Sequence, residues 1–112
     1  MATLPKTSHQ PKPYTGLPFD EVIRLRHAHL TPALITYHEK PLMLVEGHMQ
    51  YVYDDSGRRY LDGFAGIVTV GCGHGHPAIT AAAKEQLETL VHATTIYANQ
   101  EVSLYGQALA EK

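Results

Sequence analysis

One stretch of the chain, from Tyr60 to Pro77, narrows the choice of fold more than any other. It opens as a strand signal, passes through the apolar run Ile67–Val70, crosses three alternating glycines and ends at a proline. A helical pattern follows at once, because apolar residues then recur every three or four positions. Proline suits the first helical turn, where the amide that it lacks would have no partner. The sequence therefore predicts a strand, a glycine loop and a helix, in that order.

The three glycines of this loop are Gly71, Gly73 and Gly75. Glycine adopts positive φ without a steric penalty, and it lets another backbone or a ligand approach closely. A loop that faces the start of a helix can also hold an anion on free backbone amides. The spacing G-x-G-x-G is neither the dinucleotide-binding motif nor a P-loop. A tight structural connection is the preferred interpretation, and anion binding is the alternative.

Three potential metal ligands, Cys72, His74 and His76, lie in the same loop. Cysteine and histidine are the side chains that zinc prefers. Alternate residues of one tight loop rarely supply a complete tetrahedral set, and no second cluster completes this one. The sequence therefore predicts no metal site, and it predicts that the histidines fix the turn by hydrogen bonding.

The remaining patterns predict an α/β chain. Asp20 and Glu21 suit the positive N-terminal end of a first helix. Turn signals at Gly47-His48 and at Asp54–Gly57 separate three runs, which form a small antiparallel meander. The predicted elements are a disordered or extended arm over residues 1–16, a helix at Pro18–His29, strands at Leu42–Glu46, Met49–Asp54 and Arg58–Asp62, a helix at Pro77–Val91, and a last helix capped by Asn99.

An aromatic face on the middle strand and an apolar face on the last helix are both expected to be buried by packing. Tyr51 and Tyr53 point to one side of their strand, and packing is a more common role for such a face than ligand binding. In the last helix, Val102, Tyr105 and Leu109 are the expected buried side. That helix still consists of good helix formers at the end of the chain, and little sheet is available to cover it. A fragment of a larger domain is therefore expected.

Composition excludes several classes of protein. With 112 residues and a net charge of −2, the chain has room for one small domain and carries no basic patch for nucleic acid. No apolar run approaches the roughly 20 residues of a membrane span. The single cysteine, Cys72, indicates a reducing compartment. Residues 1–13 lack both a signal-peptide core and arginine, so a cytoplasmic location is expected, with a mitochondrial one as the alternative.

Several motifs, in order, resemble one known family. The runs Tyr60–Val70 and Gly73–Pro77 are similar to the N-terminal signature of class-III (ω-type) pyridoxal-phosphate aminotransferases. Lys40–Gly47 and His92–Asn99 match on either side, so that the resemblance covers about Pro13–Lys112. Within the class, the sequence most resembles members of the mitochondrial kind that use alanine and glyoxylate.

This resemblance implies the N-terminal part of a fold-type-I transferase: a helix, a small meander, a glycine loop and two helices beside a larger α/β domain. It implies amino-group transfer from an amino acid such as alanine to a 2-oxo acid such as glyoxylate or pyruvate, in a homodimer or homotetramer. The alternatives are donors such as ornithine, 4-aminobutyrate or β-alanine, a phospho-lyase activity, or a non-catalytic interaction fragment. A small zinc protein is the alternative from a different class.

Pyridoxal 5'-phosphate would be bound by residues beyond this segment, and no catalytic residue is expected within it. None of the lysines matches the position of the family's Schiff-base lysine. They are Lys6, Lys12, Lys40, Lys84 and Lys112.

The resemblance places two residues of the chain near substrate. Ile67 matches a position whose side-chain size helps to select the substrate, and Gly66 beside it allows close approach of the backbone. Tyr37 matches a tyrosine on the approach to the pocket in ornithine-handling members. The structural alternatives stay open: Ile67 as a strand core residue, and Tyr37 as a packed aromatic after the first helix.

Overall fold

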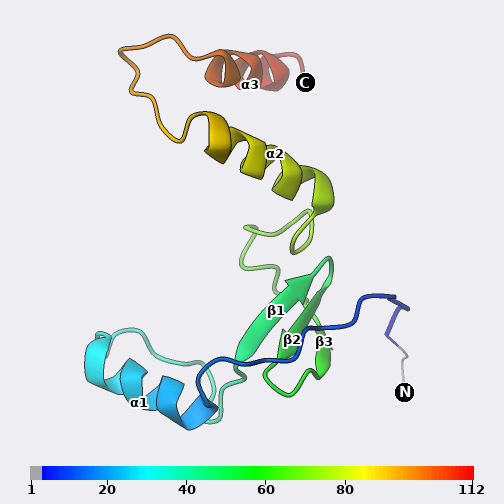
Figure 1. Ribbon diagram of the computed structural model, residues 1–112, viewed down its shortest axis with the longest axis vertical. Helices are drawn as coiled ribbons and strands as arrows, with labels where there is room; N and C mark the ends of the chain where they lie inside the picture. The colour runs from blue at the N-terminus through cyan, green and yellow to red at the C-terminus, as the bar shows by residue number, and fades with distance from the viewer. Residues whose placement is uncertain (1–3) are drawn as a thin grey trace. The chain divides into compact units, whose positions relative to one another are not determined.

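A computed structural model describes residues 4–112 of the chain, which divide into two units. The first unit extends to His76, and the second runs from Pro77 to Lys112. The α/β class predicted from the sequence is confirmed. In chain order, the elements are α1 (Phe19–His29), β1 (Leu44–His48), β2 (Tyr51–Asp54), β3 (Arg59–Leu61), α2 (Pro77–Thr89) and α3 (Gln100–Ala110), as labelled in Figure 1.

Helix α1 lies within one residue of its predicted bounds. Pro18 precedes it in an extended conformation, with φ −58° and ψ 151°. In the first turns, the Arg24 guanidinium donates two hydrogen bonds of 2.7 Å to the Glu21 carboxylate. The helix ends at His29 because Pro32 disfavours helical backbone at the residue before it.

The three strands form an antiparallel meander in the order β1-β2-β3. The predicted turn at Gly47-His48 is wrong: β1 continues through both residues, and the chain reverses at Met49 and Gln50. The reason is tertiary. Met49 is held at φ 49° while its amide and carbonyl pair with His74, in two hydrogen bonds of 2.7 and 2.8 Å. The short turn pattern at Gly47-His48 gives no information about the pairing of Met49 with a residue as distant in sequence as His74.

The core of the meander is aromatic. Tyr51 and Tyr53 are its buried hydrophobic side chains, with 0% and 1% of their surface exposed. The Tyr51 hydroxyl donates to the carbonyl of Pro5 at 2.6 Å, and the Arg59 guanidinium lies 4.8 Å from the Tyr51 ring centre. The prediction that this face serves packing is confirmed.

The arm before α1 lies along the sheet in an extended conformation (Figure 1). The His9 ring stacks on His48 at 4.0 Å and contacts the Glu46 carboxylate through Nε2. The backbone amide of Lys12 donates to the same carboxylate at 2.8 Å. These contacts lower the pKa of Glu46, the Lys12 amide chiefly and His9 next. The arm therefore adds both polar and stacking contacts to a small sheet.

Asp54 organises the β2–β3 turn. Its Oδ1 accepts from the Ser56 hydroxyl at 2.6 Å and from the amides of Ser56 and Arg58 at 3.0 Å, and Oδ2 accepts from the Tyr60 hydroxyl at 2.7 Å. These donors, with the Ser56 hydroxyl the largest cause, lower the pKa of Asp54 from 3.8 to about 2. Gly57 closes the turn at φ +80°, as the sequence predicts.

The pKa of Asp54 is lower in the folded chain than in the unfolded chain. The contribution of its carboxylate to the free energy of unfolding is therefore complete above about pH 4 and is lost as the pH falls toward 2. We expect this carboxylate to contribute between about 1 and 2 kcal/mol, the smaller value allowing for solvent screening. A carbon-13 titration of the Asp54 carboxyl group should show a midpoint near 2. An ordinary midpoint, together with an unchanged turn in Asp54→Asn, would contradict this expectation.

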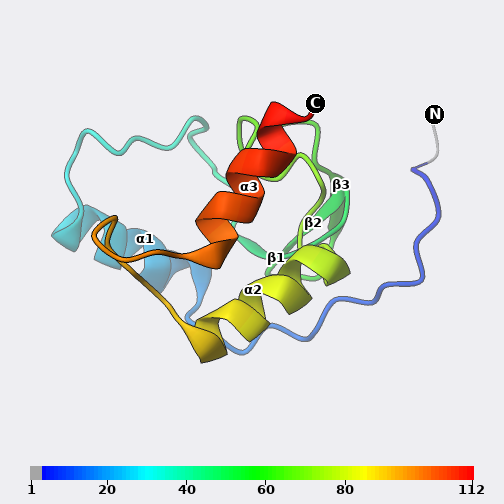
Figure 2. The same ribbon diagram turned by 90° about the horizontal axis from the view of Figure 1, so that it is seen from above.

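The second unit consists of two helices joined by residues 90–99 (Figure 2). Helix α2 begins at Pro77, as predicted, and ends two residues before the predicted Val91. Helix α3 follows the predicted cap, since Asn99 Oδ1 accepts from the Val102 amide at 3.1 Å.

The predicted burial of α3 is wrong for this chain: Val102, Tyr105 and Leu109 are 71%, 67% and 56% exposed. Within the second unit, as far as the structure describes it, α2 and α3 do not pack against each other, so neither helix buries its apolar side on the other. Across residues 4–112, no helix is both long and apolar enough to cross a membrane.

Candidate functional site

The run predicted as strand before the glycines is instead a left-handed turn. Four consecutive residues from Ala65 to Val68 have φ of 50°, 58°, 50° and 65°. Only Gly66 among them adopts this conformation freely, and each other residue costs about 1–2 kcal/mol. The strand prediction for Ile67–Val70 is therefore wrong. Backbone strain of this kind clusters at functional sites, so this loop is the candidate site.

Hydrogen bonds within the turn keep its shape. The Thr69 hydroxyl donates to the carbonyl of Gly66 at 2.7 Å, and the Val70 amide donates to the carbonyl of Ala65 at 3.1 Å. The Ile67 amide donates to the carbonyl of Phe64 at 3.1 Å. The turn therefore satisfies several of its own backbone groups while it presents its side chains outward.

Asp62 joins the two ends of this loop. Its Oδ1 accepts from the amides of Phe64 and Ala65, both at 2.9 Å, and its Oδ2 accepts from His74 Nε2 at 2.7 Å. The side chains of Asp62 and His74 are 13% and 26% exposed. The His74 hydrogen bond, followed by the two amides, lowers the pKa of Asp62. The carboxylate is therefore charged at neutral pH and draws the loop entry toward the loop exit.

His74 in turn ties the loop to the sheet. It forms an antiparallel bridge with Met49, and its ring fills the space above Gly47, where a Cβ atom would lie 2.6 Å from the imidazole Cγ. Gly73 adopts φ +97° and passes 3.0 Å from Met49 Cα, measured from an ideal Cβ position. The predicted role of His74 in fixing the turn is confirmed. His76 differs, because its buried Nδ1 has no hydrogen-bond partner among residues 4–112.

The glycine loop itself is a connection, which was the preferred interpretation. The amides of Gly73 and His74 donate to the carbonyls of Val70 and Met49, both at 2.8 Å, so they do not face an anion. Over residues 4–112, no three histidine, cysteine or acidic side chains converge as metal ligands. Cys72 is exposed, and His74 Nε2 is directed at Asp62.

A cavity of about 280 Å³ lies beneath the loop. Asp62 and His74 contribute polar side chains to its lining, which also includes Ala65 of the left-handed turn. It is lined by Met49, Gln50, Asp62, Ala65, Val70, Gly71, Cys72, Gly73 and His74.

The two residues predicted to lie near substrate are both on the surface. Ile67 is 68% exposed within the left-handed turn, and Tyr37 is 95% exposed, with its ring edge-on to His38 at 5.5 Å. Neither residue lines the cavity beneath the loop or the larger one described next. The structure therefore does not bring them together in one cavity, and it buries neither as a core residue.

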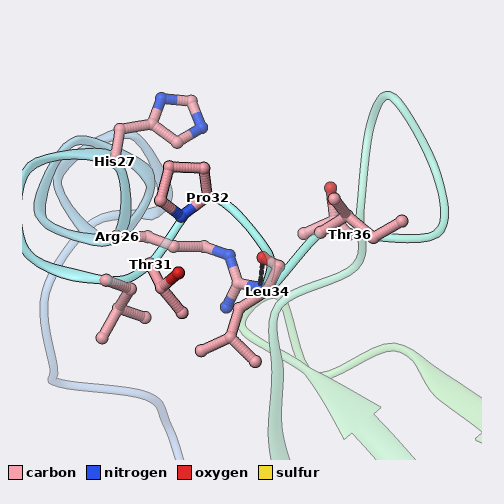
Figure 3. A pocket seen from close by; sticks show the side chains of 8 residues that line it. Arg26, His27, Thr31, Pro32, Leu34 and Thr36 are labelled. Atoms are coloured by element: carbon pink, nitrogen blue, oxygen red, sulfur yellow. Dashed lines mark hydrogen bonds between the residues drawn. The ribbon is translucent and has the colours of Figure 1, made fainter.

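A larger cavity, of about 510 Å³, lies at the end of α1 (Figure 3). Arg26 reaches across it and donates from its guanidinium to the carbonyl of Leu34. A cation near the last turn of a helix is favoured by the helix dipole, so Arg26 holds the following loop in place. The remaining lining residues are His27, Leu30, Thr31, Pro32, Ile35 and Thr36.

The sequence did not identify Asp62 or Arg26 as organising residues. An aspartate followed by glycine after a strand is a turn signal, because its carboxylate bonds amides two or three residues ahead. That signal was available for Asp62. The contacts of Asp62 with His74 and of Arg26 with Leu34 span 12 and 8 residues, and no local pattern announces them.

The lining of the cavity beneath the loop and of the cavity at the end of α1 does not fit pyridoxal phosphate. The two glycine-loop amides that might cradle a phosphate are paired with carbonyls. No lysine lines either the cavity beneath the loop or the cavity at the end of α1. Neither of these two cavities therefore combines free amides for a phosphate with a lysine for a Schiff base.

Comparison with known proteins places the whole chain in one family. The family model for class-III aminotransferases matches residues 35–112. The mitochondrial alanine–glyoxylate aminotransferase 2 homolog 2 of Arabidopsis thaliana is 43% identical over 111 residues, which are 99% of this chain and 23% of that protein. An acetylornithine aminotransferase of Caldanaerobacter subterraneus is 46% identical over 76 residues, which are 68% of this chain and 19% of that protein.

A solved structure agrees with this placement. An (S)-enantioselective omega-transaminase from Thermomicrobium roseum superposes with a TM-score of 0.71 and 35% identity, over 88% of this chain and 23% of that one. The chain thus spans less than a quarter of the length of the relatives that it matches. On the strength of the family model and of these relatives, the chain belongs to the class-III aminotransferase family.

Proposed function

We propose that this chain is the N-terminal segment, over residues 17–112 and preceded by the arm, of an enzyme that transfers an amino group from an amino acid such as alanine to a 2-oxo acid such as glyoxylate or pyruvate. The observation that carries this proposal is the 43% identity to the Arabidopsis alanine–glyoxylate aminotransferase homolog, which extends over 99% of the chain. The match to the acetylornithine enzyme covers only 68% of it. The similarity to the first therefore extends over nearly the whole chain, whereas the second leaves about a third of the chain unmatched.

Within this enzyme, we propose that Ile67 limits the size of the amino-donor side chain. The strained turn exposes an apolar side chain that packing alone would bury, and it offers a rigid apolar surface against which a small side chain fits. Tyr37 is proposed as a second contact, on the approach to the substrate. Its exposed phenol combines an apolar ring with a hydroxyl that both donates and accepts hydrogen bonds.

Class-III aminotransferases use pyridoxal phosphate, which supplies the electron sink for breaking the bond to the amino-acid α-hydrogen. Because the two cavities described above do not fit the cofactor, we propose that residues beyond Lys112 bind it. The part played by this segment is to present Ile67 and Tyr37 and to anchor the loop that carries Ile67.

Assembly and location are also proposals. A homodimer or homotetramer would cover the exposed apolar residues of the loop and of the second unit. We propose a cytoplasmic or a mitochondrial location, and the name of the Arabidopsis relative favours the second. Sedimentation of the purified gene product and fractionation of the source cells decide these two points.

Another amino donor is the second candidate function. The acetylornithine aminotransferase match, at 46% identity, favours it for the part of the chain that both matches share. The assays described below compare the two donors directly. A non-catalytic interaction fragment remains the alternative outside catalysis.

The test begins with the message beyond the codon for Lys112, followed by assays of the complete gene product with pyridoxal phosphate. We expect a continuing reading frame with a later lysine, and amino transfer from alanine to glyoxylate. Transfer from N-acetylornithine in preference to alanine would replace the first proposal by the second. Absence of transfer with every donor would overturn the catalytic proposal.

A further inference from the structure

We infer that Asp62, acting through His74, is the positioning residue that fixes how Ile67 is presented, and that it thereby helps to set which amino-donor side chains are accepted. This inference rests on the proposed function, because it takes Ile67 to face the substrate. It assigns a role to two side chains that lie outside any substrate contact.

The first step is that one carboxylate binds both ends of the loop. Asp62 Oδ1 holds the loop entry through the amides of Phe64 and Ala65, at 2.9 Å each. Asp62 Oδ2 holds the loop exit through His74 Nε2, at 2.7 Å. The left-handed residues lie between these two points, so their placement follows from a single side chain.

The second step is that the exit is itself fixed to the sheet. Both backbone polar groups of His74 pair with Met49, at 2.7 and 2.8 Å. The absence of a side chain at Gly47 leaves room for the imidazole. The hydrogen bond from Asp62 therefore orients the loop relative to a rigid strand turn.

The third step is that the backbone conformation of Ile67 depends on support from surrounding residues. A β-branched residue at φ 50° is strained, and such strain persists only where the surroundings over-determine it. Ile67 is 68% exposed, so packing contributes little to this. Hydrogen bonds within the turn keep its local shape. Its placement relative to the sheet is set at its ends, where Asp62 and His74 act.

The test compares two donors that differ by one methylene, L-alanine and L-2-aminobutyrate, in the complete gene product with its cofactor. We expect Asp62→Ala to change the ratio of their kcat/KM values by about tenfold in favour of the larger donor, in the same direction as Ile67→Ala. The double variant should change the ratio no further than Ile67→Ala alone, because both act through one element.

Two variants control this result. Asp55→Ala removes an exposed carboxylate from the β2–β3 turn and should leave the ratio unchanged. Asp62→Asn keeps an oxygen that accepts from the Phe64 and Ala65 amides, and its amide nitrogen can donate to the unprotonated Nε2 of a neutral His74, so it should retain most of the wild-type ratio. An Asp62→Ala enzyme that loses kcat equally with both donors, at an unchanged ratio, would overturn the inference.

A second readout does not depend on activity. Hydrogen exchange of the peptide covering residues 64–73 should accelerate in Asp62→Ala and His74→Ala, but not in Asp55→Ala. Unchanged exchange in the first two variants would overturn the inference by itself. If the wild-type protein transfers no amino group, the proposed function and the donor-selection role of Asp62 fail together, while exchange still shows whether Asp62 positions the loop.

Discussion

The isolated 112-residue chain, supplied with pyridoxal phosphate, alanine and glyoxylate, should transfer amino groups no faster than the cofactor alone. Its residues provide no lysine in either cavity described above, and the loop amides that might hold a phosphate are paired with carbonyls. A cofactor that is neither bound nor oriented gains nothing from the protein. Rate measurements with and without the chain, at equal cofactor concentration, check this expectation.

The complete gene product is the matched control for that experiment, and it should accelerate the same reaction by orders of magnitude. Retention of cofactor after gel filtration provides a second measure, which should be positive for the complete protein and negative for the segment. Turnover by the segment alone would show that its own residues form a catalytic pocket, contrary to the geometry of the loop.

Gly47→Val should disrupt the pairing between His74 and Met49, which joins the loop to the sheet. A Cβ atom at Gly47 would lie 2.6 Å from the Cγ of His74, so the imidazole must leave its place. That movement breaks the hydrogen bond with Asp62 and weakens the bridge to Met49. Overpacking of this kind costs about 2 kcal/mol, which corresponds to a roughly thirtyfold faster exchange of the Met49 and His74 amides.

Gly71→Ala is the control, because it adds the first carbon of a side chain to the same loop at a position where nothing lies within 4 Å. It should leave the exchange of both amides unchanged. Equal protection in Gly47→Val and in the wild type would show that the strand tolerates a side chain here. The close approach of the His74 ring to Gly47 would then not be needed for the pairing between His74 and Met49.

Local chemistry allowed much of the fold to be predicted. The end of α1 follows from Pro32, the start of α2 from Pro77 and the start of α3 from Asn99, and each was found within a residue. These signals act through a missing amide, a restricted φ or a side chain that reaches the nearest backbone amides. Such effects operate over one helical turn, so they can be read from a sequence.

The candidate site was predicted less completely. The run Ile67–Val70 is apolar and β-branched, and by propensity alone it belongs in a strand. In the structure it forms a strained turn because Asp62, Thr69 and His74 supply hydrogen bonds that a strand would not use. Likewise, β1 runs through Gly47 and His48, because the bridge to His74 moves the reversal to Met49.

By itself, the sequence determined the class of the fold, the order and most ends of its helices, the aromatic core of the meander and the family resemblance. All of these depend on residue type and short spacing. Only the tertiary structure decided where β1 turns, that Ile67 stands exposed in a left-handed turn, and that Asp62 and His74 anchor it. The physical reason is distance along the chain: a contact between residues 12 positions apart outweighs local preference, and it exists only once the chain has folded.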